Sequence, residues 1–371
     1  MRVLQFGKFY PPHVGGIERV IFDLTEGLNA RGLSCDVLCS NKCRRYSEED
    51  ERGYRVMRTK SHAILFSASI SPQLASKLRE VQARYDVIHV HLPDPMANLA
   101  LFLARPRARV VLHWHNDVVR QRVLLRFYLP LQEWMLRRAD AIIATSPNYI
   151  KGSPYLSRHE GKCRVVPVGV DGSRLVPDQA AVAEIRERFK GKKIVFTIGR
   201  LSRYKGYDYL IDAARLLGED YVVLIAGLGP EERRLKRQIA EQGLGGKVVM
   251  LGHLPQDRIA SYYQACDVFC LSSVSRNEGF GLVQIEAMLF GKPVVSTAIE
   301  GSGVTWANID GETGLVVEPR NPGALAEAID RICSDPDLYS RLGSGGMKRA
   351  SEQFTLERMI SGTIEVYESV V

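Results

Sequence analysis

The sequence predicts an α/β protein built from two doubly wound parallel sheets. Short β-branched runs alternate with longer helical patterns along the whole chain, which is typical of βαβ units. The chain has 371 residues, enough for two sizeable cores. The alternation also starts afresh at Lys193 after a short charged helix. We therefore expect one domain in residues 1–170 and a second in residues 171–352.

The expected strands are short apolar runs in each half. In the first half they are residues 3–6, 35–39, 87–91, 110–113, 141–145 and 164–168. In the second half they are residues 193–198, 221–226, 248–251, 268–271, 294–296 and 315–317. Between the first two runs, apolar residues recur at the spacing of one helix face: Ile17, Val20, Ile21, Leu24 and Leu28. Two such domains would create a cleft between the carboxyl ends of their sheets, where open α/β folds bind ligands.

Positive charge is concentrated in the first half. The net charge is +8, but residues 1–170 hold 26 Lys and Arg against 15 Asp and Glu, whereas the remainder holds 24 against 27. This asymmetry indicates an anionic partner for the first half. Residues 105–138 hold eight Arg among Leu and aromatic residues, which fits an interfacial membrane element or an amphipathic helix packed on its own sheet. No nucleic-acid motif accompanies the charge, so we expect no nucleic-acid partner.

The cysteines and the N-terminal residues bear on the compartment. Seven Cys is an odd number, and they lack the paired spacing of a zinc site, so we expect reduced thiols in a cytoplasmic protein. No secretory leader is visible at the N-terminus, and no apolar window approaches the roughly 18 residues needed to cross a bilayer. Any contact with a membrane would therefore be peripheral.

A glycine-bearing segment follows the first strand of each half. Gly15 and Gly16 precede the helix near Ile17 and would let backbone N–H groups approach an anion, although an ordinary tight turn explains them equally well. In the second half, residues 199–206 read Gly-Arg-Leu-Ser-Arg-Tyr-Lys-Gly. Arg200 and Lys205 then lie where a strand ends and a helix begins, which favours a diphosphate site over plain surface charge.

Two carboxylates, Glu278 and Glu286, bracket a Gly-Phe-Gly-Leu segment. Gly279 and Gly281 argue against one continuous helix, so we place Glu278 in a loop and start the helix near Leu282. Free N–H groups in the first turn would face an anion, while the carboxylates accept hydrogen bonds from hydroxyls on either side. A helix N-cap followed by a solvated Glu is the plain alternative.

His113 and His115 lie at the end of an expected strand. Residues two apart on a strand share one face, but no third ligand is nearby, so we expect no metal site. The imidazoles could line the cleft or contact a sugar, and His115 lies nearer the carboxyl end of the strand. The one Asp-x-Asp sequence, from Asp335 to Asp337, lies in a late helical region and is interpreted as a helix cap.

Together these segments resemble the retaining glycosyltransferases of family 4, which have the GT-B fold of two facing Rossmann-like domains with parallel sheets and an interdomain cleft. The resemblance spans nearly the whole chain. Its specific parts occur in the order of the family: Gly15-Gly16, residues 199–206, Glu278 to Glu286, and residues 311–315. In such a fold, residues 1–170 would bind the acceptor and residues 171–352 the nucleotide-sugar donor, and a helix in residues 353–371 would cross back to the N-terminal domain.

The resemblance also implies roles for individual residues. Arg200 and Lys205 would hold the donor's diphosphate, Glu286 its ribose and Glu278 its sugar, and His115 would be the cleft histidine. His113 is an addition to the family pattern, so which of the two histidines acts stays open. We expect His115, Glu278, Arg200 and Lys205 to be catalytic. We expect the donor to bind Gly16, Arg200, Lys205, Gly252, Leu254, Glu278, Gly279, Phe280, Gly281, Leu282 and Glu286.

The implied activity is a retaining hexosyl transfer without metal or cofactor. Fixed cations and helix N–H groups would stabilise the departing nucleoside diphosphate, whose phosphate takes the acceptor's proton. The chain looks most like bacterial O-antigen and capsule mannosyl- and rhamnosyltransferases. We therefore expect transfer of mannose from GDP-mannose to a growing, lipid-linked surface glycan, by a cytoplasmic protein peripheral at the inner face of the cell membrane and in contact with its anionic surface. The alternatives are a UDP-sugar transferase acting on a soluble acceptor and a nucleotide-sugar-binding protein without activity.

Overall fold

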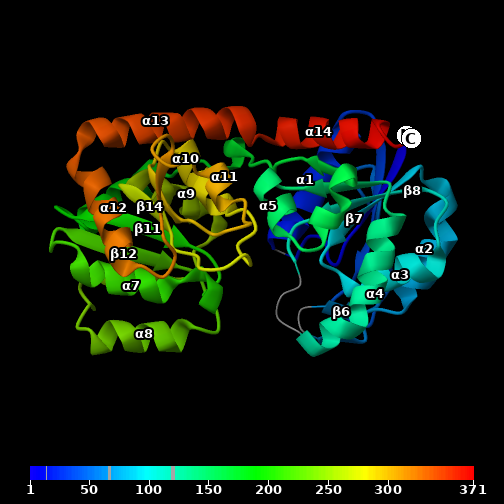
Figure 1. Cartoon of the computed structure of the whole chain (residues 1–371), viewed down its shortest axis with the longest axis horizontal. Coiled ribbons are helices and arrows are strands. Elements are labelled where there is room, and N and C mark those ends of the chain that lie inside the picture. The colour runs from blue at the N-terminus through cyan, green and yellow to red at the C-terminus, as the bar shows by residue number, and fades with distance from the viewer. Residues whose placement is uncertain (14, 66–67, 118–121) are drawn as a thin grey trace. The chain divides into compact units, whose positions relative to one another are not determined.

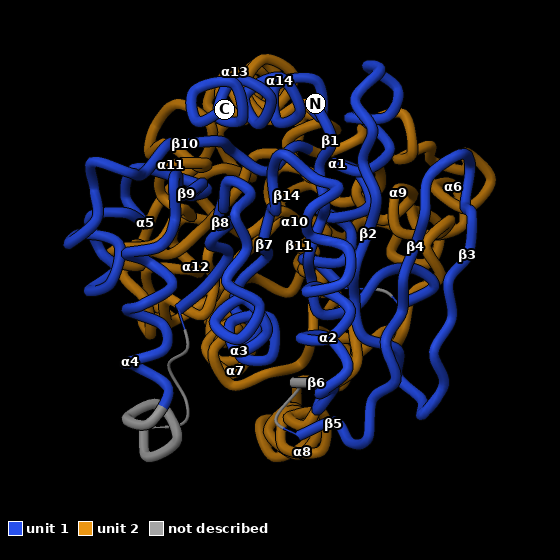
Figure 2. The backbone as a smooth tube through the Cα atoms, turned by 90° about the vertical axis from the view of Figure 1, so that its right-hand side faces the viewer, with its two compact units in different colours: residues 1–169, 356–371 blue, residues 170–355 orange. Residues whose placement is uncertain are grey.

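A computed structural model describes the chain except residues 14, 66–67 and 118–121 and the side chains of residues 68 and 122–127. It contains two compact units (Figure 2). Unit 1 comprises residues 1–169 and 356–371, and unit 2 comprises residues 170–355. The chain therefore leaves unit 1, forms the whole of unit 2, and returns to unit 1 with its last helix.

Unit 1 is built on an eight-stranded sheet with the strand order β10-β9-β8-β7-β1-β2-β4-β3. The strands are β1 (Arg2–Phe6), β2 (Ser34–Ser40), β3 (Ser47–Glu51), β4 (Tyr54–Thr59), β7 (Val87–Leu92), β8 (Arg109–Trp114), β9 (Ala141–Ala144) and β10 (Cys163–Val165). A separate hairpin joins β5 (Ala63–Leu65) and β6 (Ala68–Ile70). All pairs in the large sheet are parallel except β3 with β4. The strand order reverses between β1 and β7, so this is the topological switch point of unit 1.

The antiparallel edge of this sheet was not expected from the sequence. Strand β3 reads Ser-Glu-Glu-Asp-Glu, which has neither β-branched residues nor apolar alternation. Its backbone pairs with β4, and Arg58 on β4 adds ion pairs of 2.7 Å with both Glu49 and Glu51. A cross-strand pairing of this kind has no signal in the local hydrophobic pattern.

Helices cover both faces of the unit 1 sheet (Figure 1). They are α1 (Gly16–Ala30), α2 (Gln73–Val81), α3 (Pro95–Ala104), α4 (Arg122–Arg138), α5 (Pro147–Gly152) and α14 (Leu356–Glu368), with short 3-10 helices at Gln82–Arg84 and Leu156–Lys162. As the periodicity predicts, α1 buries Val20, Ile21, Leu24 and Leu28. Helix α14 lies beside α1, and a Cβ atom added to Gly27 would come within 2.1 Å of Ile360.

The two faces of β1 differ in chemistry. Leu4 and Phe6 enter an apolar core that includes Leu78 of α2 and Leu101 of α3. Gln5, between them in sequence, points to the opposite face, where it meets α14. Unit 1 therefore has one apolar face and one face with buried polar groups.

Unit 2 is built on a six-stranded parallel sheet with the order β13-β12-β11-β14-β15-β16. The strands are β11 (Lys193–Ile198), β12 (Tyr221–Ala226), β13 (Val248–Gly252), β14 (Val268–Leu271), β15 (Val294–Thr297) and β16 (Gly314–Val317). The helices are α6 (Gln179–Arg188), α7 (Tyr207–Leu216), α8 (Glu232–Glu241), α9 (Gln256–Ala265), α10 (Leu282–Leu289), α11 (Val304–Ala307), α12 (Pro322–Ser334) and α13 (Pro336–Gln353), with 3-10 turns at Gly172–Arg174 and Arg203–Lys205. Every strand predicted for this half is present, and its switch point lies between β11 and β14.

The Asp335 carboxylate accepts hydrogen bonds from the N–H groups of Asp337 and Leu338 at the start of α13, which confirms the interpretation as a helix cap. The seven cysteines have free thiols. Among the described helices, none combines the length and apolar composition needed to span a bilayer.

Candidate active site

The switch point of unit 2 brings together two predicted site residues. Strands β11 and β14 are neighbours in the sheet, so the loops after their carboxyl ends lie side by side. Lys205 comes from the loop after β11 and Glu278 from the loop after β14. Lys205 Nζ lies 2.7 Å from Glu278 Oε2, and each residue is less than a tenth exposed. The sequence predicted both residues but not this ion pair.

A close backbone approach and a side-chain hydrogen bond join the two loops. Gly206 has φ +65, and a Cβ atom there would lie 2.1 Å from the carbonyl oxygen of Ser272. The Ser272 hydroxyl in turn donates a hydrogen bond of 3.0 Å to the carbonyl oxygen of Lys205. Because only glycine allows this approach, Gly206 sets the position of the Lys205 side chain.

Glu278 is held on both sides. The Ser273 hydroxyl donates to the same Oε2 atom at 2.7 Å, and Oε1 accepts no hydrogen bond from the described residues. The Ser302 hydroxyl donates to the Glu278 carbonyl oxygen, and the Gly303 N–H donates to the carbonyl oxygen of Gly279 at 2.8 Å. The carboxylate is therefore rigid and has one oxygen available for a ligand.

The charge on Lys205 is stabilised by its partner. Burial alone would lower the pKa of the ammonium, but the Glu278 carboxylate beside it raises that pKa above its usual value. The Lys205 ammonium is therefore charged at neutral pH. A buried ammonium fixed by a carboxylate can bind a further anion without having to reorganise.

Helix α10 begins at Leu282, where the sequence placed it. Gly281 precedes it with φ +73, and a Cβ atom there would come within 2.7 Å of the Leu271 side chain. The first N–H groups of a helix lack intrahelical partners, so this end of α10 can bind an anion. Glu286 lies just over one turn further on, and its Oε2 accepts a hydrogen bond of 2.7 Å from the Tyr263 hydroxyl. Phe280 packs against Trp306 and Phe354 below the loop.

The other predicted residues of unit 2 lie on strand-end loops. Arg200 directly follows Gly199 after β11, and its guanidinium is exposed and makes no hydrogen bond or ion pair with the described residues. Gly252 ends β13 with φ +69, and the half-buried Leu254 follows it. In unit 1, Gly16 opens α1, and a Cβ atom there would have no neighbour within 4 Å. Within unit 2, no described contact joins Arg200, Gly252 or Leu254 to the Lys205–Glu278 pair.

His115 directly follows β8 in unit 1 and belongs to a stack of four imidazoles. Ring centroids are 4.2 Å apart for His113 and His115, 5.2 Å for His91 and His113, and 4.6 Å for His89 and His91. The expectation that no further ligand lies near His113 and His115 was wrong. Strand β7, which pairs with β8, carries its own His-x-His on the same face of the sheet. The repeated pattern was visible in the sequence, but the pairing that aligns it was not.

The four rings of this stack are neutral, and a hydrogen bond joins two of them, His91 and His115. Burial lowers the pKa of His89 and of His115 to about 3, and lowers those of His91 and His113 as well. His91 lies between Gln5 Oε1 at 2.7 Å and His115 Nε2 at 3.1 Å. Sequence reasoning missed Gln5 and His91, because their contacts join distant segments.

Three rings of the stack have nitrogens close to one another, as in a metal site. Ring nitrogens of His89, His91 and His113 lie within 4.8 Å of one another. The rings are nearly parallel, with interplanar angles of 13° to 28° among these three. In-plane lone pairs of stacked rings do not converge on one point, so the rings would have to turn before they could bind an ion.

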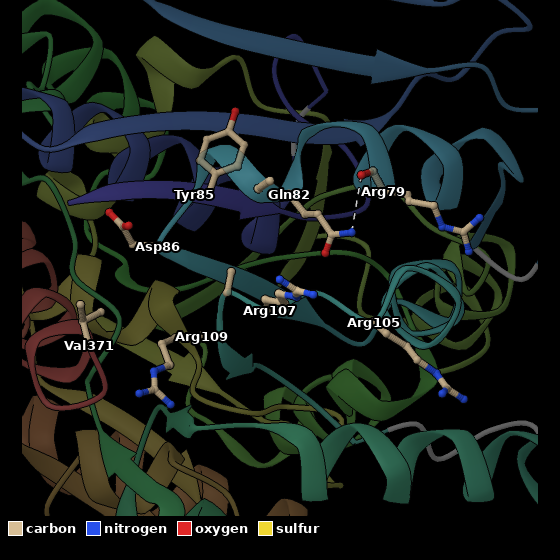
Figure 3. Close-up of a pocket in the computed structure, with 10 residues that line it drawn as sticks. Arg79, Gln82, Tyr85, Asp86, Arg105, Arg107, Arg109 and Val371 are labelled. Carbon is tan, nitrogen blue, oxygen red and sulfur yellow. Dashed lines mark hydrogen bonds between the residues drawn. The ribbon is translucent and has the colours of Figure 1, made fainter.

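A basic pocket lies at the amino ends of strands β7 and β8, opposite the ends that carry His115 (Figure 3). Asp86 precedes β7 and Arg109 opens β8, so the pocket is about 20 Å along the strands from His115. Its volume is about 610 Å³, and its lining includes Arg79, Arg105, Arg107, Arg109, Tyr85, Asp86 and Val371. Arg109 pairs with Asp140 at 3.2 Å, while the Arg107 side chain has no polar partner among the described residues. Three arginines of the basic 105–138 stretch, Arg105, Arg107 and Arg109, therefore line this pocket. Residues 118–121 of that stretch and the side chains of residues 122–127 lie outside the described part.

Solved structures share this fold along the whole chain. Sucrose-phosphate synthase from Thermosynechococcus elongatus matches with a TM-score of 0.81 at 24% identity, over 100% of this chain and 99% of that one. Anabaena HepE in complex with UDP-glucose matches with a TM-score of 0.79 at 22% identity, over all of both chains. Two Rossmann-like units with loops at the carboxyl ends of parallel strands define a GT-B glycosyltransferase fold.

Sequence relatives identify the family. Residues 14–174 match Glycosyltransferase Family 4, and residues 178–349 match Glycosyl transferases group 1. The O-antigen chain mannosyltransferase C of Escherichia coli is 32% identical over 100% of this chain and 99% of its own. The D-rhamnosyltransferase WbpZ of Pseudomonas aeruginosa is 35% identical over 96% and 92%. A GDP-mannose-dependent phosphatidylinositol monomannoside mannosyltransferase of Mycolicibacterium smegmatis is 28% identical over 91% and 90%. The chain belongs to the family 4 glycosyltransferases, as the resemblance predicted.

Proposed function

We propose that this chain is a retaining hexosyltransferase that moves mannose from GDP-mannose to a growing, lipid-linked cell-surface glycan. The observation that carries the proposal is the buried Lys205–Glu278 pair beside the first turn of α10, at the switch point of unit 2. The names of the relatives support the choice of sugar, since they include mannosyl- and rhamnosyltransferases and a GDP-mannose-dependent enzyme.

In this proposal the donor's diphosphate binds Lys205 and Arg200, and the Leu282 N–H donates to a phosphate oxygen. The leaving nucleoside diphosphate gains negative charge as the bond to the sugar breaks. Fixed cations and helix N–H groups stabilise that charge more strongly in the transition state than in the ground state. This chemistry needs neither a metal ion nor a cofactor.

The remaining donor contacts involve other polar groups of the site. Glu278 Oε1 accepts a hydrogen bond from a sugar hydroxyl, with the backbone of residues 279–281 beside it. Glu286, oriented by Tyr263, accepts from the ribose hydroxyls. Backbone groups from Gly252 to Leu254 bind the base. In unit 1, Gly16 serves a phosphate and His115 the reacting sugar.

The transfer step then uses one face of the sugar. The acceptor oxygen bonds to the anomeric carbon on the face from which the phosphate departs, and its proton passes to that phosphate oxygen. Configuration is retained, and no protein nucleophile forms a covalent intermediate.

The acceptor side of the proposal rests on unit 1. Its basic pocket, with Arg105 and Arg107 exposed, fits the anionic headgroups of a membrane that carries the acceptor lipid. Because the pocket lies at the other edge of the sheet from His115, it would contact the membrane surface rather than the reacting sugar.

A thermal-shift panel tests the donor. GDP-mannose at about 100 times its Kd should stabilise the protein by about 2.7 kcal/mol, with and without EDTA, whereas UDP-glucose should have little effect. Glu286→Gln, which keeps the size of the side chain but weakens ribose binding, should reduce the shift. Stabilisation confined to UDP-sugars, or abolished by EDTA, would contradict the proposal.

A further inference from the structure

We infer that Gln5 and His91 set the ring tautomer of His115, holding its proton on Nε2 and leaving Nδ1 as a hydrogen-bond acceptor. Both are positioning residues, since they act on His115 and not on substrate. The identity of the group that donates to His115 Nδ1 rests on the function proposed above. The tautomer itself does not depend on that function.

The chain of hydrogen bonds starts at α14. Gln5 Nε2 donates to the Tyr367 hydroxyl at 3.2 Å, and Tyr367 also contacts His89 Nδ1. This orientation turns Gln5 Oε1 toward His91 Nε2, 2.7 Å away. An amide oxygen can only accept, so the hydrogen of this bond belongs to His91 Nε2.

The next bond follows from the charge state of His91. Burial keeps this imidazole neutral, so it carries one proton and one lone pair. With the proton on Nε2, the lone pair is on Nδ1. His115 Nε2 lies 3.1 Å from that atom and must therefore donate. Since His115 is also neutral, its Nδ1 is unprotonated.

The same geometry distinguishes His115 from His113. Neither ring nitrogen of His113 has a partner among the described residues, and the side chain is fully buried. His115 is 7% exposed, more than any other ring in the stack. His115 is therefore the ring whose proton is placed by hydrogen bonds and which can still be reached from outside.

The consequence for the reaction is a specific chemical role. An unprotonated Nδ1 accepts a hydrogen bond from a sugar hydroxyl and cannot donate to a phosphate oxygen. His115 would thus orient the sugar, while the charge of the leaving group is left to Lys205 and Arg200.

Nitrogen NMR tests the tautomer without substrate. In protein labelled with 15N-histidine at about pH 8, protonated and unprotonated ring nitrogens resonate in separate regions. The chain has eight His, and the His115→Asn spectrum identifies the signals of His115. We expect the proton on Nε2. A proton on Nδ1 in the unmodified protein would overturn the inference.

Three variants test the cause. Gln5→Met removes the acceptor of His91, so the His115 signals should shift toward a mixture of tautomers. Gln5→Glu keeps an acceptor oxygen and should restore the original signals. His89→Gln is the matched control, because it replaces another buried ring of the stack. It leaves the Gln5–His91 and His91–His115 hydrogen bonds intact. An unchanged His115 spectrum in folded Gln5→Met would contradict the role of Gln5.

Kinetics separate this inference from the proposed function. His91→Leu should lower kcat about tenfold, with the donor KM changed less than about twofold, because one transition-state hydrogen bond is lost. If GDP-mannose fails to stabilise the protein while NMR finds the proton of His115 on Nε2, the tautomer inference is supported and the proposed function is contradicted. Normal kcat in an active His91→Leu protein would limit His91 to a structural role.

Discussion

The two units differ in the groups that they bury near the switch points of their sheets. Unit 1 is strongly basic, yet the four imidazoles buried on one face of its sheet are neutral, and four of its arginines line a pocket at the amino ends of the strands. Unit 2 has a slight excess of acidic residues, yet it buries a full ion pair at its switch point. Neutral rings suit hydrogen bonding to an uncharged sugar, whereas a fixed ammonium suits a diphosphate. The difference therefore divides the proposed reaction into a sugar side and a leaving-group side.

The largest effect should come from breaking the ion pair of unit 2. Lys205→Met leaves the Glu278 carboxylate buried without its partner, which should cost about 3–5 kcal/mol of the free energy of unfolding. Hydrogen exchange of β11 and β14 peptides measures this loss within unit 2. Transfer should also fall below detection, because the diphosphate loses its buried cation.

A double variant separates the two consequences. Lys205→Met with Glu278→Gln removes both charges, so most of the stability should return while transfer stays absent. Recovery of transfer in the double variant would show that Lys205 serves only to balance Glu278. If hydrogen exchange of unit 2 were as slow in Lys205→Met as in the unmodified chain, the buried ion pair would not stabilise unit 2. The contrast in buried charge between the units would then have no energetic meaning.

An intermediate effect is expected in unit 1 at acidic pH. His89 and His115 have a pKa of about 3 in the folded chain and about 6.5 when unfolded, so the unfolded state binds more protons between these values. The free energy of unfolding of unit 1 should thus fall as pH drops from about 6.5, by up to about 1.4 kcal/mol per pH unit for each such histidine.

Hydrogen exchange of β7 and β8 peptides between about pH 7 and pH 5 would measure this slope, after correction for the intrinsic exchange rate. His89→Leu should flatten it by the share of one histidine. The matched control is exposed His253→Gln in unit 2, which should leave it unchanged. A slope in unit 1 no steeper than that in unit 2 would contradict the neutral stack.

The smallest effect on stability should come from the surface arginines of unit 1. Arg105→Gln with Arg107→Gln should change the free energy of unfolding by less than about 0.5 kcal/mol. Binding to vesicles that contain anionic phospholipid should nevertheless weaken about 30-fold, at about 1 kcal/mol for each lost charge. Arg233→Gln with Arg237→Gln in unit 2 is the charge-matched control. Equal loss in both double variants would mean that net charge alone governs the binding.

Much of the fold could be predicted because its signals are local. The runs at residues 193–198 and 268–271 are apolar and β-branched, and both are strands. The start of α10 at Leu282 followed from the two glycines before it. These features depend on neighbouring residues, which the sequence displays directly.

The rest depends on which segments pair. Glu278 meets Lys205 because β14 lies beside β11, and His91 meets His115 because β7 lies beside β8. Neither strand pairing can be predicted from a short stretch of sequence, because each joins segments that are far apart in the chain. The same holds for Arg58 on β4, which forms ion pairs with Glu49 and Glu51 of the acidic strand β3.

Helix α14 also determines the order in which the two units can finish folding during synthesis. Unit 2 is one continuous segment and can fold once residue 355 has left the ribosome. Unit 1 begins first but lacks Tyr367, which holds Gln5 and contacts His89, until the last helix emerges. The usual N-to-C order of domain folding is therefore reversed for its final step. The hydrogen-bond chain that reaches His115 is completed only after unit 2 has been synthesised in full.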